Sequence, residues 1–359
     1  MPEPTPNSPL KASSRPIRVL IIDDSALVRE LLSKLLQTDG DIQVVGTAGD
    51  PYIARQRIKD LNPDVLTLDV EMPRMDGISF LRNLMRLRPL PVVMISAYTE
   101  AGAEITLEAL ALGAVDFVTK PQQNLEGSLG EFAAEIRAKV RAAASSPVRR
   151  LGAQEAEPLD HSLVARLQAH PNLAGPRLIA LGASAGGTEA IGQIVRALPA
   201  GSPPVVVCQH LPALFTRLFA NRLDGLGALR AREAADGDPL EPGRVYVAPG
   251  DRHLLVRAWG GQLRCRLDDG PPVNRHKPSV DVLFESLARL RDCEIKAAIL
   301  TGMGRDGASG LLALRRAGGH TLAQDEASSL VWGMPGAAVK LGAAGQVLPL
   351  AAIPRWLLD

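Results

Sequence analysis

The chain alternates twice between short apolar runs and longer amphipathic segments, and a proline-bearing stretch separates the two alternations. In the first, segments such as 26–37 and 78–87 carry apolar residues at helical spacing. Five strand–helix units of this length predict an α/β domain whose parallel sheet is covered by helices on both faces. The expected strands are Val19–Ile22, Gln43–Gly46, Val65–Leu68, Val92–Ile95 and Val115–Val118.

The second alternation begins at Leu178 and predicts a doubly wound α/β domain with a mostly parallel sheet. The stretch from Val245 to Leu267 has no obvious helix between its apolar runs, which predicts an embedded antiparallel hairpin. Further strands are expected at Val205–Cys208, Val245–Ala248, Leu263–Leu267, Ala297–Leu300 and His320–Ala323.

A chain of 359 residues is long enough for two domains with separate cores. Residues 1–16 are rich in proline, serine and threonine and predict a disordered extension. We expect the first domain at 17–141, an interdomain linker at 142–176 and the second domain at 177–359. The linker is expected to contain a short helix around 162–169.

Composition narrows the functional classes. A formal charge of +1 without a sustained basic run gives no electrostatic reason to expect nucleic-acid binding. No apolar run approaches the roughly 20 residues that span a bilayer, and the N-terminus lacks the pattern of a signal peptide. Three widely spaced cysteines indicate neither a disulfide framework nor a cysteine zinc site. We therefore expect a cytoplasmic protein without direct membrane insertion.

Polar residues follow the apolar runs of the first domain. Because the carboxyl ends of parallel strands meet at one sheet edge, these side chains are expected to converge there. Three carboxylates at one edge favour a hard cation such as Mg²⁺, beside which an aspartate can accept a phosphoryl group. Lys120 would neutralise that group, and Ser96 would donate a hydrogen bond to it. The residues are Asp23, Asp24, Asp69, Ser96 and Lys120.

Residues 18–141 resemble a response-regulator receiver domain, which implies a flavodoxin-like fold. The resemblance rests on Asp23-Asp24, on Leu68–Gly77, on Ser96-Ala97 and on Thr119-Lys120-Pro121. It implies that Asp69 is the phosphoacceptor and that Asp23, Asp24 and Asp69 surround a Mg²⁺ ion. It also implies contacts from Ser96 and Lys120 to the phosphoryl group, and a cis peptide between Lys120 and Pro121.

In the second domain, the apolar run from Leu178 ends in Gly182-Ala183-Ser184-Ala185-Gly186, a G-x-S-x-G pattern. Small neighbours let a sharp turn expose the serine oxygen, as in the nucleophile elbow of serine hydrolases. The same pattern also suits an ordinary strand–helix turn or a phosphate cradle at a helix N-terminus. Nucleotide binding fits poorly, because the turn lacks the lysine of a P-loop.

A nucleophilic serine needs a base and a carboxylate that orients the base. His210 follows the strand expected beside the one that precedes Ser184, which favours it over His276. Asp306 lies in the glycine-rich turn after residues 297–300 and is favoured over Asp251 and Asp281. Backbone N–H groups near the serine, at Ala185, and at Met303 are expected to hold an oxyanion.

These segments closely resemble the chemotaxis protein-glutamate methylesterase/glutamine deamidase family, and the two resemblances cover nearly the whole chain. The second rests on residues 181–190, Gln209-His210, residues 273–284 and residues 300–307. The family implies a Ser184–His210–Asp306 triad that hydrolyses glutamate γ-methyl esters on chemoreceptors, releasing methanol, and often deamidates receptor glutamines. It implies no cofactor for hydrolysis, and a chemotaxis histidine kinase as phosphodonor.

The chain departs from the family pattern at two positions, and one other interpretation of its second domain is possible from the sequence. Ala185 stands where many relatives have threonine, and Arg305 occupies a variable position of the glycine-rich turn. The rival is a receiver joined to a non-catalytic output, such as a DNA-binding or docking module. No terminal helix-turn-helix with a basic recognition helix is evident, and the rival gives the glycine-rich turns no role.

Overall fold

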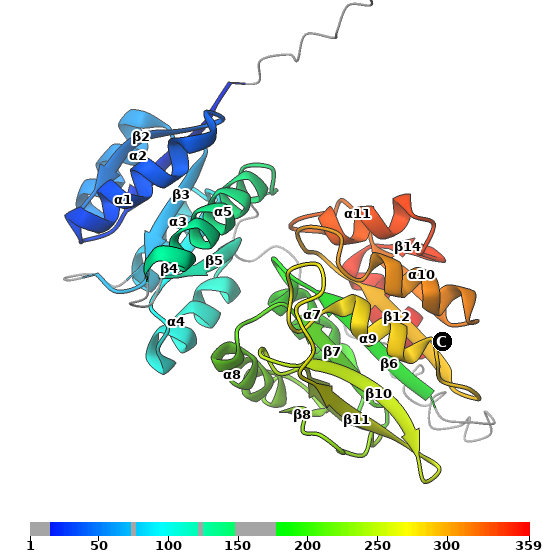
Figure 1. Cartoon of the computed structure of the whole chain (residues 1–359). Coiled ribbons are helices and arrows are strands. Elements are labelled where there is room, and N and C mark those ends of the chain that lie inside the picture. Colours follow the sequence, from blue (N-terminus) through cyan, green and yellow to red (C-terminus); the bar gives the residue numbers. More distant parts are fainter. Residues whose placement is uncertain (1–14, 73–76, 121–124, 148–176) are drawn as a thin grey trace, which may run out of the picture.

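A computed structural model of the chain describes residues 15–72, 77–120, 125–147 and 177–359. It contains two α/β domains, one drawn from blue to bluish green and one from green to red (Figure 1). The predicted N-terminal extension lies outside the described residues up to position 14. The predicted linker helix at 162–169 and the expected cis bond to Pro121 also lie outside them.

The first domain has a five-stranded, fully parallel sheet with the order β2-β1-β3-β4-β5, as predicted. Helices α1 and α5 pack on one face, and α2, α3 and α4 supply apolar side chains to the other. Helix α5 continues to Ala144, beyond position 141. The elements are β1 (Ile17–Ile22), α1 (Ala26–Leu36), η1 (Gln37–Asp39), β2 (Ile42–Ala48), α2 (Pro51–Leu61), β3 (Val65–Asp69), α3 (Gly77–Leu87), β4 (Val92–Ser96), α4 (Glu100–Ala111), β5 (Asp116–Thr119) and α5 (Leu125–Ala144).

The second domain has a seven-stranded parallel sheet with the order β14-β13-β12-β6-β7-β9-β8. Its elements are β6 (Arg177–Ala183), α7 (Gly187–Ala197), β7 (Val205–Gln209), α8 (Ala213–Asp224), β8 (Arg230–Glu233), β9 (Arg244–Val247), β10 (His253–Trp259), β11 (Gln262–Asp268), α9 (Val280–Leu287), β12 (Glu294–Ile299), α10 (Ala308–Arg316), β13 (His320–Gln324), α11 (Gly333–Lys340), β14 (Gln346–Leu348), η2 (Leu350–Ala352) and α12 (Ile353–Leu358).

The predicted hairpin is present as β10 and β11, which pair antiparallel from His253 with Asp268 to Trp259 with Gln262. The two strands form a sheet of their own rather than joining the seven-stranded sheet. Its inward-facing Leu254, Val256 and Cys265 pack into the core that includes α9. Buried and exposed residues alternate along β11, as in an antiparallel sheet with one face on the core and one face exposed to solvent.

Strand β6 lies in the middle of the sheet, between β7 and β12. Its residues from Leu178 onward are buried, as expected of a central parallel strand that helices cover on both faces. The chain leaves the carboxyl end of β6 at Ser184, that of β7 at His210 and that of β12 at Leu300. Three adjacent strands therefore deliver the predicted chemistry to one edge.

Helix α4 of the first domain lies against α7 and α8 of the second (Figure 1). The ring of Phe117, on β5, stacks on Phe215 of α8 with centroids 4.5 Å apart and planes inclined by 17°. Arg222 donates from Nη1 to the carbonyl oxygen of Leu107 at 2.7 Å, and Arg217 forms an ion pair with Glu100. Buried apolar residues of both domains form one continuous cluster across this interface.

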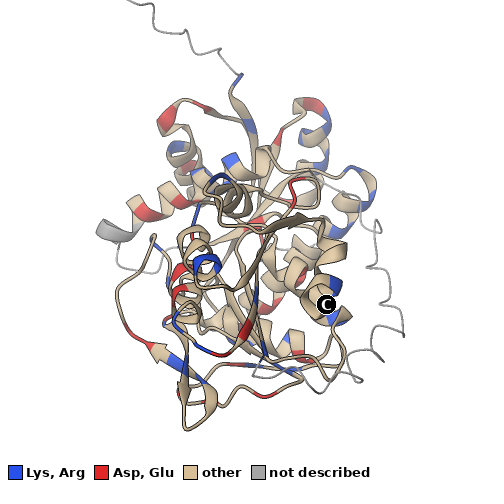
Figure 2. Cartoon of the chain, turned by 90° about the vertical axis from the view of Figure 1, so that its right-hand side faces the viewer, with Lys and Arg blue, Asp and Glu red and all other residues tan. Residues whose placement is uncertain are grey.

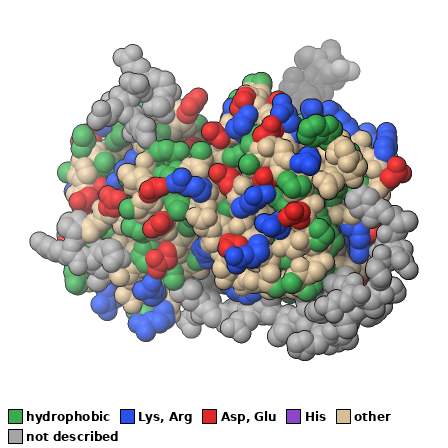
Figure 3. Space-filling view, turned by 90° about the horizontal axis from the view of Figure 1, so that it is seen from below, with side chains coloured by type: hydrophobic (Ala, Val, Ile, Leu, Met, Phe, Trp, Pro, Cys, Tyr) green, Lys and Arg blue, Asp and Glu red, His purple; other side chains and the backbone are tan. Residues whose placement is uncertain are grey.

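Acidic and basic residues are interspersed along the chain in both domains (Figure 2). The face in Figure 3 likewise mixes the two signs with apolar and neutral side chains. Among the residues that the structure describes, no helix is both long enough and apolar enough to cross a membrane.

Candidate active site

The turn after β6 holds Ser184 by its main chain. The N–H of Ser184 donates to the carbonyl oxygen of Thr301 at 3.1 Å, which joins the turn to the end of β12. The carbonyl oxygen of Ser184 accepts from the N–H of Gly187 and from Nε2 of Gln209, both at 2.8 Å. Gly186 has a φ of 74°, a conformation that glycine adopts without strain. The turn then leads directly into α7.

His210 and Asp306 come together in the loops that follow β7 and β12, the two strands beside β6. The Nε2 atom of His210 lies 2.8 Å from Oδ2 of Asp306, although 96 positions separate the residues in sequence. Both side chains are buried, with the Asp306 side chain only 1% exposed. This contact is the arrangement that a base and its orienting carboxylate require.

Further hydrogen bonds fix the Asp306 carboxylate. Its Oδ1 accepts from Oγ of Ser279 at 2.7 Å and from Nδ2 of Asn274 at 2.8 Å, and its Oδ2 also accepts from the N–H of Val280 at 2.7 Å. Burial alone would raise the pKa of Asp306. The hydrogen bonds from His210, Asn274 and Ser279 outweigh burial and hold this pKa well below its usual range. The carboxylate is therefore charged at neutral pH.

The other ring nitrogen of His210, Nδ1, is buried and has no hydrogen-bond partner among the described residues. No hydrogen bond joins the Ser184 hydroxyl to this ring within the described parts of the chain. The structure therefore joins His210 to Asp306 by a hydrogen bond, whereas Ser184 and His210 are not hydrogen-bonded in the described residues. Hydrogen bonds of catalytic residues are often long in proteins without substrate and tighten when substrate binds.

Two of the rival residues, His276 and Asp281, lie close to the proposed triad and make other contacts. The ring of His276 stacks on that of His210, with centroids 3.8 Å apart. Asp281 accepts from Nδ2 of Asn274 and from the N–H of Gly310, and burial raises its pKa. It thus belongs to the network behind Asp306. Asp251 makes no hydrogen bond to His210 in the described structure.

Two backbone N–H groups near Ser184 make no hydrogen bond within the described residues, those of Ala185 and Met303. The turn at 301–304 approaches Ser184 closely, because a Cβ on Gly302 would lie 2.9 Å from the Cβ of Ser184. Any larger residue there would collide with the serine. Both of the N–H groups expected to hold an oxyanion are thus available as donors.

The contacts of Asn274 and Ser279 with Asp306 are not predictable from the sequence pattern. Both lie outside any strand end, and Asn274 occupies a turn with a φ of 53°. The only local signal was the position of Ser279, which caps α9 by accepting from the N–H of Val282. The polar loop at 273–278 offered a rival histidine and part of the family resemblance, but neither predicts a hydrogen bond to Asp306.

The acidic residues of the first domain converge as predicted. Carboxylate oxygens of Asp23, Asp24 and Asp69 lie within 4.8 Å of one another, a typical set for Mg²⁺. Nζ of Lys120 lies 2.8 Å from Oδ2 of Asp69 and 3.4 Å from Oδ2 of Asp23. The latter oxygen is buried and accepts no hydrogen bond from the described residues, so this group of side chains fits a cation.

The pKa of the Asp69 carboxyl is raised above its usual value. Burial is the main cause and the charge of Asp23 adds to it, so that the pKa rises to about 6 despite the opposing effect of Lys120. Ser96 lies at the end of β4 as predicted, and its hydroxyl is bonded to Thr106 and to main-chain oxygens. It makes no hydrogen bond to Asp69 in the described structure.

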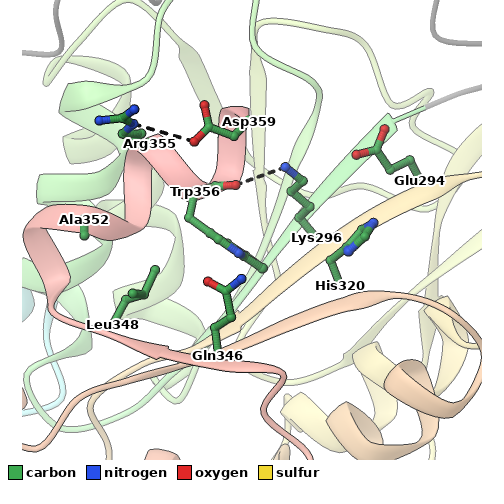
Figure 4. Close-up of a pocket in the computed structure, with 9 residues that line it drawn as sticks. All are labelled: Glu294, Lys296, His320, Gln346, Leu348, Ala352, Arg355, Trp356 and Asp359. Atoms are coloured by element: carbon green, nitrogen blue, oxygen red, sulfur yellow. Dashed lines mark hydrogen bonds and ion pairs between the residues drawn. The ribbon is translucent and has the colours of Figure 1, made fainter.

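A separate cavity of about 520 Å³ opens at the other end of the sheet (Figure 4). Glu294, Lys296 and His320 reach it from the amino ends of β12 and β13, and Trp356 of α12 forms part of its wall. Nζ of Lys296 donates to the carbonyl oxygen of Trp356 at 3.0 Å. Because Ser184 and His210 follow the carboxyl ends of their strands, this cavity is not the candidate active site.

The fold and these contacts define a receiver domain joined to an α/β hydrolase domain. Residues 19–127 match the response regulator receiver domain, and residues 179–357 match the family described as CheB methylesterase. The chain belongs to the CheB methylesterase family and carries a receiver domain. It is thus a chemotaxis hydrolase of the methylesterase/glutaminase type under receiver control.

Relatives of known name are similar in sequence to this chain over almost its full length. A "Protein-glutamate methylesterase/protein-glutamine glutaminase 1" of Xanthomonas euvesicatoria is 55% identical over 96% of this chain and 97% of its own. A protein of the same name from Hahella chejuensis is 52% identical over 95% of this chain and 97% of its own. The crystal structure of the Thermotoga maritima CheB methylesterase catalytic domain is 38% identical, with a TM-score of 0.50 over 51% of this chain and 97% of that one.

Proposed function

We propose that this protein hydrolyses glutamate γ-methyl esters on chemoreceptor proteins, releases methanol, and deamidates receptor glutamines. The His210–Asp306 contact beside the Ser184 turn carries the proposal. Methyl esters and primary amides both present a carbonyl carbon to a serine nucleophile, so one site serves both reactions. The relatives' names combine the same two activities.

In the proposed mechanism, Oγ of Ser184 attacks the ester carbonyl carbon while its proton passes to Nδ1 of His210. Asp306 holds the ring through Nε2 and stabilises the imidazolium. The N–H groups of Ala185 and Met303 stabilise the oxyanion. The intermediate then breaks its bond to the methoxy oxygen, which takes the proton from His210 and leaves as methanol. Water repeats the sequence on the acyl-enzyme and regenerates Ser184.

In the receiver, we propose that Asp69 accepts a phosphoryl group from a histidine kinase of the chemotaxis system. Asp23, Asp24 and Asp69 would hold Mg²⁺, which neutralises negative charge during the transfer. Lys120 lies at hydrogen-bonding distance from Asp69 and would pair with the phosphoryl oxygens. Ser96 would exchange its present bonds for one to the phosphoryl group. Ester hydrolysis itself requires no cofactor in this scheme.

Control by the receiver follows from the interdomain contacts. Segment 329–332, next to the Ser184 turn, lines a cavity of about 730 Å³ together with Arg141 and Ala142 of α5 and Ser145, which follows that helix. The unphosphorylated receiver therefore limits access of a large substrate to this side of the catalytic domain. Phosphorylation adds charge at the Asp69 edge and favours a state in which α4 and β5 release α8.

We propose domains at 17–141 and 177–359, with the first extended to the end of α5 at Ala144 and the residues between the two domains as the linker. A linker keeps the receiver at high effective concentration beside the catalytic domain, as intramolecular inhibition needs. We propose that the reaction takes place in the cytoplasm, where the proposed kinase would phosphorylate Asp69.

Replacement of Ser184 by alanine tests the proposed chemistry. The Ser184→Ala protein should fold normally and release no methanol from methylated receptor membranes. His210→Ala should behave in the same way, because the nucleophile then lacks its base. His320→Ala is the matched control, since His320 lies at the opposite end of the sheet. Methanol release by Ser184→Ala at the wild-type rate would overturn the proposal.

A further inference from the structure

Thr301 is the second residue after β12, and its side chain is buried at 2% exposure. Its hydroxyl oxygen accepts from the N–H groups of Leu330 and Val331, at 3.1 and 2.9 Å. The same hydroxyl lies 2.9 Å from the carbonyl oxygen of Ala185, to which it donates. A single buried hydroxyl thus joins the turn after Ser184 to segment 330–331.

The main chain of Thr301 adds a second link to the same turn, since its carbonyl oxygen accepts from the N–H of Ser184 at 3.1 Å. Thr301 therefore binds the peptide groups on both sides of the one that joins Ser184 to Ala185. Peptide groups are planar, so fixing the two flanking planes limits the rotation of the plane between them. That middle plane carries the Ala185 N–H, one of the two proposed oxyanion donors.

The segment held by the hydroxyl also supports the second donor. Val331 accepts from the N–H of Gly302 at 2.9 Å, and the N–H of Met334 donates back to Gly302 at 2.8 Å. Gly302 directly precedes Met303, whose N–H is the other proposed donor. Leu330 packs beside Gly186, where an added Cβ would lie only 2.8 Å from the leucine Cβ. The Thr301 hydroxyl therefore contacts both the turn that carries the Ala185 N–H and the segment that holds the residue before Met303.

We propose that the Thr301 hydroxyl is a positioning group that keeps both oxyanion donors aimed at the reacting carbonyl. It touches neither substrate nor His210 and acts through the Ala185 and Met303 N–H groups. The inference rests on the proposed function, because it assumes a serine nucleophile and an oxyanion. Donors that are held in place stabilise the transition state more than the bound ester, so the effect falls on kcat rather than on KM.

Thr301→Val and Thr301→Ser form the test pair in the full-length protein, with p-nitrophenyl acetate as the substrate. Valine keeps the shape of threonine but lacks the hydroxyl, whereas serine keeps the hydroxyl. Loss of one oxyanion donor costs roughly a hundredfold or more in kcat, so misaimed donors should cost about tenfold or more. We expect this fall in kcat for Thr301→Val at unchanged KM, and Thr301→Ser within about threefold of wild type.

The pH profile and thermal stability separate positioning from a general loss of structure. The pH midpoint of kcat/KM should be the same in Thr301→Val and wild type, because the base is untouched. A wild-type kcat in folded Thr301→Val would overturn the inference, and so would an equal loss in Thr301→Ser. If Thr301→Val does not fold, Thr301→Cys replaces it, and a kcat equal to that of Thr301→Ser would contradict the inference.

Ser184→Ala, assayed in parallel, keeps the two proposals distinguishable. Hydrolysis by Ser184→Ala would remove the serine mechanism and with it the role of Thr301. An inactive Ser184→Ala beside a fully active Thr301→Val would leave the proposed function standing and refute only the positioning role.

Discussion

The imidazole of His276 lies flat against that of His210, with ring centroids 3.8 Å apart and ring planes inclined by 8°. Burial and the neighbouring His210 lower the pKa of His276 to about 4. His276 is therefore neutral when the enzyme works near neutral pH. It covers one face of the proposed base and leaves that base as the group that accepts the serine proton.

Replacement of His276 by glutamine should reduce the acid sensitivity of the fold. Below pH 6.5 the unfolded chain protonates this histidine while the folded chain does not, so stability falls as pH falls toward 4. The free energy of unfolding should lose up to about 3 kcal/mol more in wild type than in His276→Gln over this window. Asp69, whose pKa is raised to about 6, contributes with the opposite sign and cancels in the comparison.

Chemical unfolding of both proteins at several pH values provides the measurement. If the free energy of unfolding changes equally with pH in wild type and His276→Gln between pH 6.5 and 4, the lowered pKa of His276 is contradicted.

Ser279→Ala should weaken both the fold and the catalysis. The Ser279 hydroxyl donates to the charged Asp306, and such bonds contribute about 1.5–3 kcal/mol. We expect a comparable loss in the free energy of unfolding, together with a lower kcat, because the carboxylate that orients His210 loses a support. Ser286→Ala is the control, since the Ser286 hydroxyl accepts from the N–H of Val256 and donates to the carbonyl oxygen of Leu283, away from Asp306. An unchanged kcat in Ser279→Ala would separate Ser279 from the active site.

The double variant Arg217→Ala/Arg222→Ala should hydrolyse receptor methyl esters faster than wild type without phosphorylation. These arginines bind Glu100 and the carbonyl oxygen of Leu107 across the domain interface. A loss of about 1 kcal/mol of interface energy raises the open population about fivefold. Arg252→Ala, which breaks an ion pair beside the hairpin, controls for a general effect of lost charge. A basal rate equal to that of wild type would argue against inhibition through this interface.

Asp69→Asn should keep the unstimulated rate and lose the increase caused by acetyl phosphate. The amide accepts no phosphoryl group, while the catalytic domain is unchanged. Chelation of Mg²⁺ should have the same effect on wild type, because Asp23, Asp24 and Asp69 would lose the ion that we propose they hold. Asp60→Asn serves as an exposed control. Stimulation of Asp69→Asn to the wild-type level would show that the phosphoacceptor lies elsewhere.

The strand ends were predictable because parallel strands bring their carboxyl ends to one edge. Apolar runs located β6, β7 and β12, and with them Ser184, His210 and Asp306. Strand β8 was missed because Arg230–Glu233 is a short, polar edge strand without an apolar run. The supports of Asp306 from Asn274 and Ser279 were missed for a different reason. They depend on how the loop before α9 folds back, which no local periodicity encodes.

Covalent labelling by a fluorophosphonate tests the central claim most directly, because the probe reacts with an activated serine. Mass spectrometry of the wild-type protein should find the label on Ser184 alone, and His210→Ala should reduce the labelling rate by orders of magnitude while His320→Ala does not. Label on another serine, or an undiminished rate in His210→Ala, would contradict the proposed Ser184–His210–Asp306 chemistry.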